Sequence, residues 1–174
     1  MASKHSIVDF KSRLKGGGAR PNLFQVEMTS IDDAETKADF QYLCKAAQIP
    51  ASTVASIDVP FRGRILKVAG DRTFETWTTT IMNDTDFAVR NAMERWMSGI
   101  NDLETSLGTS DVSAYTSDIL IEQLDRDNAI LKSYVLKTCW PTAIAAIDLN
   151  MDTVSEIETF DVTWRYTSFS ASSV

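Results

Sequence analysis

The feature that most constrains the fold is the alternation of apolar and polar residues in residues 156–169, near the end of the chain. Apolar or aromatic side chains occupy every second position there: Phe160, Val162, Trp164 and Tyr166. A two-residue period places one set of side chains on a buried face of a β-strand and the other on a polar face. The same period recurs over residues 22–28, 53–61, 64–69, 72–82, 117–124, 129–140 and 143–149.

These segments predict about seven strands, joined mostly by short antiparallel connections. We expect a turn at Gly70-Asp71 and a strand break at Pro141. The polar run Asp125 to Asn128 predicts another turn, and residues 101–116 predict a polar loop. The expected fold class is therefore mainly β, a small antiparallel β-barrel or sandwich.

Two segments have helical periodicity instead. In the first, Phe40, Leu43, Cys44 and Ala47 recur at helical spacing, with Asp32 and Glu35 at capping-box spacing and Pro50 as the expected end. The second runs over residues 87–100 and has an apolar stripe that includes Val89, Met93 and Trp96. Residues 83–86 provide its expected cap. We expect this second helix to cover one side of the strands.

The length of 174 residues favours one domain spanning residues 1–174. Residues 1–20 form a basic, glycine-containing N-terminal arm, and residues 170–174 form a C-terminal tail that we expect to fray. No signal peptide is visible, and no apolar stretch approaches the roughly 18 residues of a membrane span. We therefore expect the chain to be made and folded in a cytoplasm.

The formal net charge of −7 argues against a general nucleic-acid binder, which needs a cationic surface to contact phosphates. An acidic surface is instead compatible with letting DNA pass without binding it. The two cysteines, Cys44 and Cys139, lie among apolar neighbours and far apart in the sequence. We expect both to be buried reduced thiols, although a disulfide stays open.

No set of residues predicts catalysis, a metal site or a cofactor. His5 is the single histidine and lies in the arm, where nothing would hold a general base beside a nucleophile. Asp125 and Asp127 lack the glycine and glutamate of a calcium loop. Glu156 and Glu158 share a strand face, but as an acid pair they have no identified partner. We therefore expect no enzyme activity.

Residues 57–70 predict a β-hairpin that makes contacts between molecules. Its tip combines a turn former, an aromatic residue and two cations in the sequence Pro60-Phe61-Arg62-Gly63-Arg64, and we add Asp58 and Lys67 to the expected contact residues. The arm supplies four further candidates, Lys11, Arg13, Lys15 and Arg20. Two interpretations of the arm stay open, namely a frayed terminus and a segment that docks onto an acidic neighbouring subunit.

Taken together, these residues resemble the tail tube proteins of T4-like contractile-tailed bacteriophages. The resemblance covers nearly the whole chain. It is carried by the order and spacing of FKSRLKGGGARPNLFQVEM, VPFRGRILKVAGDR, FETWTTTIMNDTDFAVRNAMERWMSGIN and IETFDVTWRYTSF. The same fold is shared by tube proteins of type VI secretion and phage-like injection systems.

The resemblance implies hexameric rings in which strands of six subunits form one continuous β-barrel, stacked into a tube inside a contractile sheath. It implies a virion protein, assembled in the host cytoplasm, through which the genome is delivered. The implied partners are further copies of the chain, the tail sheath protein, the baseplate hub, the tail terminator, the tape measure protein and genomic DNA without sequence recognition. Strand periodicity adds three candidates for the channel lining: Glu122, Asp148 and Asp161.

Two alternatives stay open. The first is the tube protein of a type VI-like or extracellular contractile injection system, which would carry protein effectors instead of DNA. The second is a monomeric ligand-binding β-barrel with an apolar cavity. The aromatic faces argue against the second, because the core needs them.

Overall fold

The computed structural model describes residues 6–29 and 34–173. Its strands are β1 (Phe24–Met28), β2 (Cys44–Ala47), β3 (Ser52–Phe61), β4 (Arg64–Phe74), β5 (Trp77–Met82), β6 (Ser117–Leu124), β7 (Ile130–Ile144), β8 (Thr159–Arg165) and β9 (Ser168–Ser173). Its helices are α1 (Ile7–Arg13), the 3-10 turn η1 (Lys15–Gly17), α2 (Ala34–Leu43), α3 (Ala88–Ile100) and α4 (Val112–Tyr115). The chain is mainly β, as predicted.

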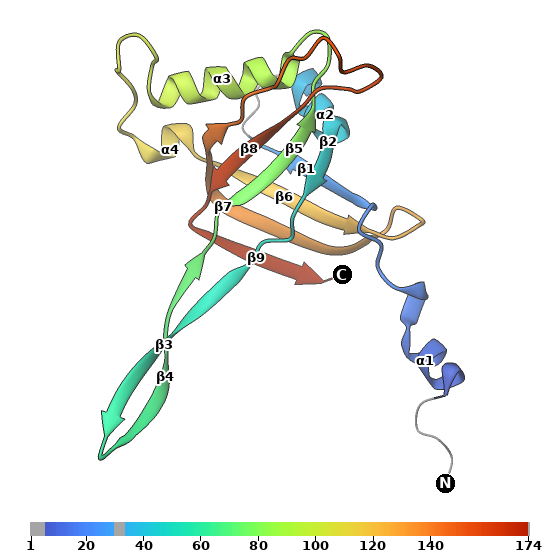
Figure 1. Cartoon of the computed structure of the whole chain (residues 1–174), viewed down its shortest axis with the longest axis vertical. Helices are drawn as coiled ribbons and strands as arrows, with labels where there is room; N and C mark the ends of the chain where they lie inside the picture. The colour runs from blue at the N-terminus through green and yellow to red at the C-terminus, as the bar shows by residue number, and fades with distance from the viewer. Residues whose placement is uncertain (1–5, 30–33, 174) are drawn as a thin grey trace.

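Seven strands form one antiparallel sheet (Figure 1). Six of them lie in the order β1-β6-β7-β8-β5-β2, and the seventh, β9, pairs with β7. The long strand β7 divides this sheet into two halves. The first sheet half consists of β1, β6, the beginning of β7 and β9; the second consists of the end of β7, β8, β5 and β2. The ladder ends at β1 and β2, which do not pair with each other in the described residues.

The two sheet halves meet where β7 bends. Thr138 has a positive φ of 59° there, and the register shifts on both sides of this position. An extra residue in one strand bends and twists it, which lets a single strand serve two sheet halves. The main-chain N–H of Thr138 donates to Asp118 Oδ1 at 3.2 Å, so a side chain of β6 satisfies the group that the bulge frees.

The core lies between the inner face of the sheet and the helices. The sheet contributes buried side chains from both halves: Val26, Met28, Ile119, Ile121 and Leu136, then Trp77, Ile81, Phe160, Val162 and Trp164. Phe40 of α2 and Val89 and Met93 of α3 complete it. The alternation predicted these inward faces in β1, β5, β6 and β8, and the structure confirms them. It also confirms the second helix, where Asp84 Oδ1 accepts the N–H of Ala88 at 3.2 Å.

The first predicted helix is shorter than expected. It ends at Leu43, and Cys44 lies in β2, opposite Ile81 of β5. Pro50 therefore does not end the helix. Pairing with β5 outweighs the local helical spacing of Cys44 and Ala47, because tertiary packing, which buries Cys44 in the core, overrides a weak local helix propensity. The predicted cap residue Asp32 lies outside the described residues.

The predicted turn at Gly70-Asp71 is wrong. Strand β4 continues to Phe74 because β3 also extends, and Ser52, Thr53 and Val54 pair with Phe74, Thr73 and Arg72 after a bulge. The break comes at residues 75–76, before β5. The predicted break at Pro141 is also wrong, since β7 runs on to Ile144. Pro141 lies at a register irregularity, where its missing N–H costs no ladder hydrogen bond.

Three further segments differ from expectation. The strand expected over residues 143–149 ends at Ile144, and the loop expected over residues 101–116 contains α4. The C-terminal residues do not fray up to Ser173, because β9 pairs with Lys132–Lys137 of β7. The strand predicted over residues 156–169 is divided at residues 166–167 into β8 and β9. No helix of the described residues combines the length and apolarity that a membrane span requires.

Candidate assembly surfaces

The β3–β4 hairpin projects away from the sheet as a two-stranded ribbon (Figure 1). Its turn consists of Arg62 and Gly63, both with positive φ (47° and 82°). A two-residue turn of this kind matches the twist of paired strands, and glycine adopts it without steric cost. All seven predicted contact residues of the hairpin lie on this ribbon: Asp58, Pro60, Phe61, Arg62, Gly63, Arg64 and Lys67.

The ribbon carries exposed apolar side chains on both of its faces. They are Val54, Ile57, Val59, Phe61, Ile65, Leu66 and Val68, with Phe61 at 67% exposure. An isolated two-stranded hairpin is at best marginally stable in water, and exposed apolar surface of this extent marks a contact surface. The ribbon is therefore a candidate contact surface.

Charged groups order the surface of the ribbon locally. Lys67 Nζ lies 2.8 Å from Asp58 Oδ1 across the two strands, in the register that pairs these residues. The guanidinium of Arg62 lies over the ring of Phe61, 5.3 Å from its centroid. Exposed pairs like these contribute little to stability, but they hold the cations and the aromatic ring at the tip in fixed positions.

The N-terminal arm is a second projection. It holds α1, which has no buried residues, and η1, and its four predicted contact residues Lys11, Arg13, Lys15 and Arg20 are all exposed. Gly16, Gly17 and Gly18 all have positive φ, so the chain turns there in a conformation that other residues rarely adopt. The arm is helical in part and does not lie on the sheet.

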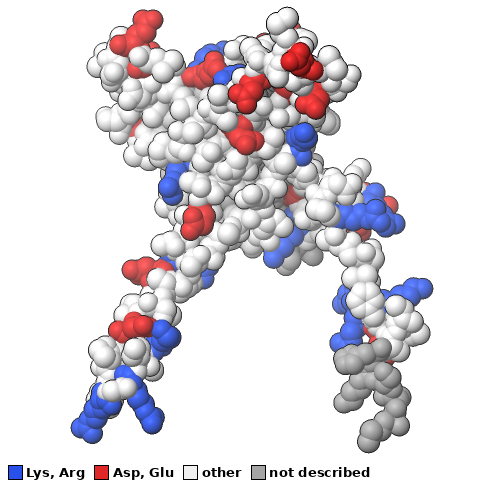
Figure 2. Space-filling model, in the orientation of Figure 1, with Lys and Arg blue, Asp and Glu red and all other residues white. Residues whose placement is uncertain are grey.

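Both projections leave the body on the same side. Figure 2 shows Lys and Arg side chains at the hairpin tip and along the described part of the arm, with some Asp and Glu side chains higher on the hairpin. At the opposite end, Asp and Glu side chains predominate on the face in view, with a few Lys and Arg side chains among them. The hairpin and the arm are therefore brought to one end of the molecule, although the sequence separates them. A molecule with cations at one end and carboxylates at the other is suited to head-to-tail contacts.

The outer face of the first sheet half has a polar row beside a mixed row of Glu27, Leu120, Val135 and Ser170. The register places Gln25, Glu122, Ser133 and Ser172 in one row across β1, β6, β7 and β9. Strand β1 pairs only with β6 and β9 only with β7, so each leaves one edge without a ladder partner in the described residues. Sequence reasoning missed β9, because its serines show no apolar alternation.

The three predicted channel-lining residues lie in different places. Glu122 lies on the outer face of the first sheet half, is 8% exposed and accepts a hydrogen bond from Gln25 Nε2 at 2.5 Å. Asp161 lies on β8 in the second half and accepts from the Thr80 hydroxyl at 2.6 Å. Asp148 is exposed in the segment that follows β7. The structure does not bring these three carboxylates together.

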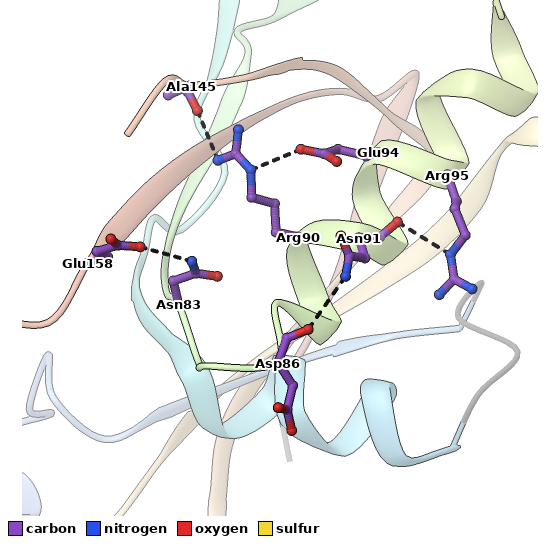
Figure 3. Close-up of polar contacts among 8 residues, drawn as sticks. All are labelled: Asn83, Asp86, Arg90, Asn91, Glu94, Arg95, Ala145 and Glu158. Atoms are coloured by element: carbon purple, nitrogen blue, oxygen red, sulfur yellow. Dashed lines mark hydrogen bonds and ion pairs between the residues drawn. The ribbon is translucent and has the colours of Figure 1, made fainter. Parts of the chain in front are cut away.

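Hydrogen bonds from Arg90 of α3 and from Asn83, which precedes α3, anchor the two ends of the segment between β7 and β8 (Figure 3). Arg90 Nε donates to Glu94 at 2.9 Å, and Arg90 Nη1 donates to the carbonyl oxygen of Ala145 at 3.3 Å. Asn83 donates to Glu158 at 3.1 Å. Both ends of residues 145–158 are therefore fixed, and the segment between them exposes the apolar side chains of Leu149, Met151, Val154 and Ile157.

Burial and hydrogen bonding shift the pKa values of Cys44, Cys139 and Asp118. Burial raises the pKa of both Cys44 and Cys139 to about 12, and both are free thiols. Burial alone would raise the pKa of Asp118, but hydrogen bonds from Lys137 and Thr138 outweigh it, so this pKa lies below its usual value. The described residues contain no cluster of three or more His, Cys, Asp or Glu side chains that could hold a metal ion.

The sequence and the fold are both similar to those of known proteins. The sequence profile of the phage tail tube protein family matches residues 19–172. The chain belongs to this family. It is 36% identical over 149 residues to tail tube protein gp19 of Enterobacteria phage T4, covering 85% of this chain and 88% of the relative. It is also 29% identical over 166 residues to the tail tube protein of Serratia phage KSP90, covering 92% and 94%.

Solved structures share the fold of this phage tail tube family member at lower identity. The anti-feeding prophage tube-terminating cap superposes with a TM-score of 0.69 at 18% identity, over 90% of this chain and 92% of the other. The sheath–tube complex of an extracellular contractile injection system called PVC gives a TM-score of 0.61 at 12% identity, over 98% and 100%. At these identities the likeness concerns the fold alone.

Proposed function

We propose that this chain is the structural subunit of the inner tube of a contractile phage tail. Six copies form a ring, rings stack head to tail, and the resulting tube is the conduit for the genome. The proposal assigns no catalytic role to the chain. It rests on membership of the tail tube family and on the surfaces described above.

The β3–β4 hairpin is the feature that best supports stacking of the rings. It exposes apolar side chains on both faces, ends in the cations Arg62 and Arg64, and points away from the sheet in the same direction as the arm. In a stack, the hairpin and the arm of one copy reach the acidic end of a copy in the next ring. A head-to-tail contact of this kind does not close on itself along the axis and therefore extends into a tube.

The open edges of the first sheet half support the ring. If β9 of one copy pairs with β1 of its neighbour, the sheet continues around the ring and the open edges of β1 and β9 are both paired. The outer face of this half would then line the channel, with Glu27 and Glu122 on it. On this account Glu122 is a lining residue, whereas Asp161 and Asp148 lie outside the first sheet half. A reconstruction of the tube checks which face borders the channel.

Several features favour DNA as the cargo. The glutamate side chains on the outer face of the first sheet half repel phosphate, and the whole chain carries a net charge of −7. Sequence identity is 36% to a phage relative but at most 18% to the injection-system structures described above. We therefore favour genome delivery over the transport of protein effectors. The tail sheath, baseplate hub, tail terminator and tape measure protein would be partners of such a tube.

The test is tube formation by the double variant Phe61→Ala, Arg62→Ala, viewed by negative-stain electron microscopy. We expect subunits with wild-type circular dichroism that form few or short tubes, because the tip loses its aromatic and cationic contacts. The matched control is Tyr42→Ala, which removes an exposed aromatic side chain from α2 on the body. Tubes of normal length and stability from the hairpin variant would refute the assigned role of the hairpin.

A further inference from the structure

Helix α1 and its C-cap residue carry an apolar stripe that no other described residue buries. Ile7 and Phe10 of α1 and the C-cap residue Leu14 recur at i, i+3 and i+7 and are all exposed. The helix has seven residues, and Ser6 caps it by accepting the N–H of Asp9 at 3.2 Å. Isolated helices shorter than about 12 residues are marginal in water, so α1 needs a surface to cover its stripe.

An apolar groove lies at the other end of the molecule, between the end of α3 and β7. It encloses about 320 Å³ and is lined by Met97, Ile100, Leu103, Trp140, Pro141 and Ile144. The ring of Trp140 packs edge-on against Tyr115 of α4, 6.1 Å between centroids, which fixes that wall. Leu103 is 90% exposed at the rim.

The rim is held in place by a compact turn. Asp102 N–H donates to the carbonyl oxygen of Leu107 at 2.8 Å, and Asp102 Oδ1 accepts from Thr105 N at 2.8 Å and from Glu104 N at 3.2 Å. These bonds hold Leu103 between two carboxylate side chains, those of Asp102 and Glu104. An exposed leucine in a hydrogen-bonded turn is a preformed contact, because little conformational freedom is lost on binding.

The two surfaces complement each other in both shape and charge. Lys11, Arg13 and Lys15 flank the apolar stripe of the arm. Glu94 lines the groove and is already paired to Arg90, and Asp102 and Glu104 are the sequence neighbours of Leu103 at the rim. Figure 1 places α1 and α3 at opposite ends of the molecule, and α3 forms one wall of the groove, so α1 does not lie in the groove of its own chain. A copy stacked in the same orientation would bring its α1 toward that groove.

We propose that Ile7, Phe10 and Leu14 of α1 dock into the α3–β7 groove of a second copy in the neighbouring ring. This contact rests on the proposed tube and adds to it a specific interlock between rings, independent of the hairpin. It assigns one role to three features: the unpartnered stripe, the exposed Leu103 and the opposite charges around them. Burial of the Phe10 side chain on assembly removes apolar surface from water and therefore lowers the concentration at which tubes form.

The test is disulfide formation in assembled tubes of the double variant Phe10→Cys, Leu103→Cys. We expect a ladder of linked subunits on a non-reducing gel when tubes are oxidised, and monomers when they are first dispersed. Disulfide formation needs Cα atoms about 5.5–6 Å apart, so only close contact gives the ladder. The native Cys44 and Cys139 are buried thiols that stay unreactive under mild oxidation.

Two matched controls sharpen the result. Val8→Cys, Leu103→Cys uses a residue of the same helix that lies off the stripe, and Phe10→Cys, Met151→Cys tests the exposed segment 145–158 as the alternative docking site. The proposal expects the ladder only in the first variant. Tubes that give no ladder with Leu103→Cys, or an equal one with either control, would overturn it while leaving the tube itself intact.

A second measurement covers the case in which the cysteine variants do not assemble. We expect Phe10→Ser to raise the critical concentration for tube formation about tenfold or more, and Val8→Ser to leave it near the wild-type value. Equal values for the two variants would contradict docking of the stripe. Failure of the wild-type chain to form tubes at any concentration would instead refute the proposed function.

Discussion

Gly99 lies near the end of α3 and Gly108 lies in the loop that follows it. Replacing each with alanine should change the stability of the fold in opposite directions. A Cβ on Gly99 meets nothing within 4 Å, whereas a Cβ on Gly108 would lie 1.9 Å from the carbonyl oxygen of Ile100. Gly99→Ala should therefore stabilise the fold by about 0.5–1 kcal/mol, because alanine favours the helix. Gly108→Ala should destabilise it by about 1–3 kcal/mol, because main-chain atoms must move.

Thermal unfolding of the two glycine variants measures this contrast. We expect the melting temperature to rise for Gly99→Ala and to fall for Gly108→Ala. An unchanged melting temperature for Gly108→Ala would mean that the loop does not return against α3 in solution. The groove described above would then lose the support of its Leu103 wall.

At the scale of the element, Asp118 stabilises the bulge of β7 on which both sheet halves depend. It accepts Lys137 Nζ at 2.5 Å and the N–H of Thr138 at 3.2 Å. Because its folded pKa is lowered, its contribution is complete above the unfolded value of about 4 and is lost as the pH falls through the folded pKa. Asp118→Asn should cost about 1 kcal/mol at neutral pH.

The same variant should also weaken the acid dependence of stability, because the titrating group is gone. Circular dichroism melts between pH 7 and pH 2 would measure this, with Asp127→Asn in the exposed 125–128 turn as the control. If Asp118→Asn and the wild type lose stability in parallel as the pH falls, the carboxylate does not hold the bulge.

Elements with one buried face were predictable, and elements that depend on pairing were not. The alternation in β1, β5, β6 and β8 identified the core residues, because each of these strands has one apolar and one polar face. Strand β9 escaped prediction because its serines are small and polar, and its pairing with β7 is a tertiary contact. Cys44 was misplaced because helical spacing competes with a strand pairing that sequence does not show.

The assembly surfaces were predictable in part. The hairpin tip was identified from its turn residues, aromatic ring and cations. The apolar side chains along β3 and β4, however, are indistinguishable in sequence from those of a strand with a buried face. Only the structure shows that both faces of the ribbon are exposed. The groove escaped prediction because its lining brings together the end of α3 and the loop after it with β7, which lies about 40 residues further along the sequence.

At the scale of the whole molecule, the chain combines two elements that are marginally stable on their own, the β3–β4 hairpin and α1, with unpaired edges on β1 and β9. The hairpin, α1, β1 and β9 each lack a partner within the described residues that would cover or pair them fully. Under the proposed function, further copies of the chain supply these missing partners. Opposite charges at the two ends favour one direction of stacking over the reverse.

Electron microscopy of the purified wild-type chain at increasing concentration tests this account most directly. We expect stacked rings with an open central channel, and a reconstruction in which the β3–β4 hairpin crosses from one ring to the next. A monodisperse monomer at all concentrations, with or without a preformed tube end as a seed, would contradict the account. It would return the monomeric ligand-binding barrel to consideration.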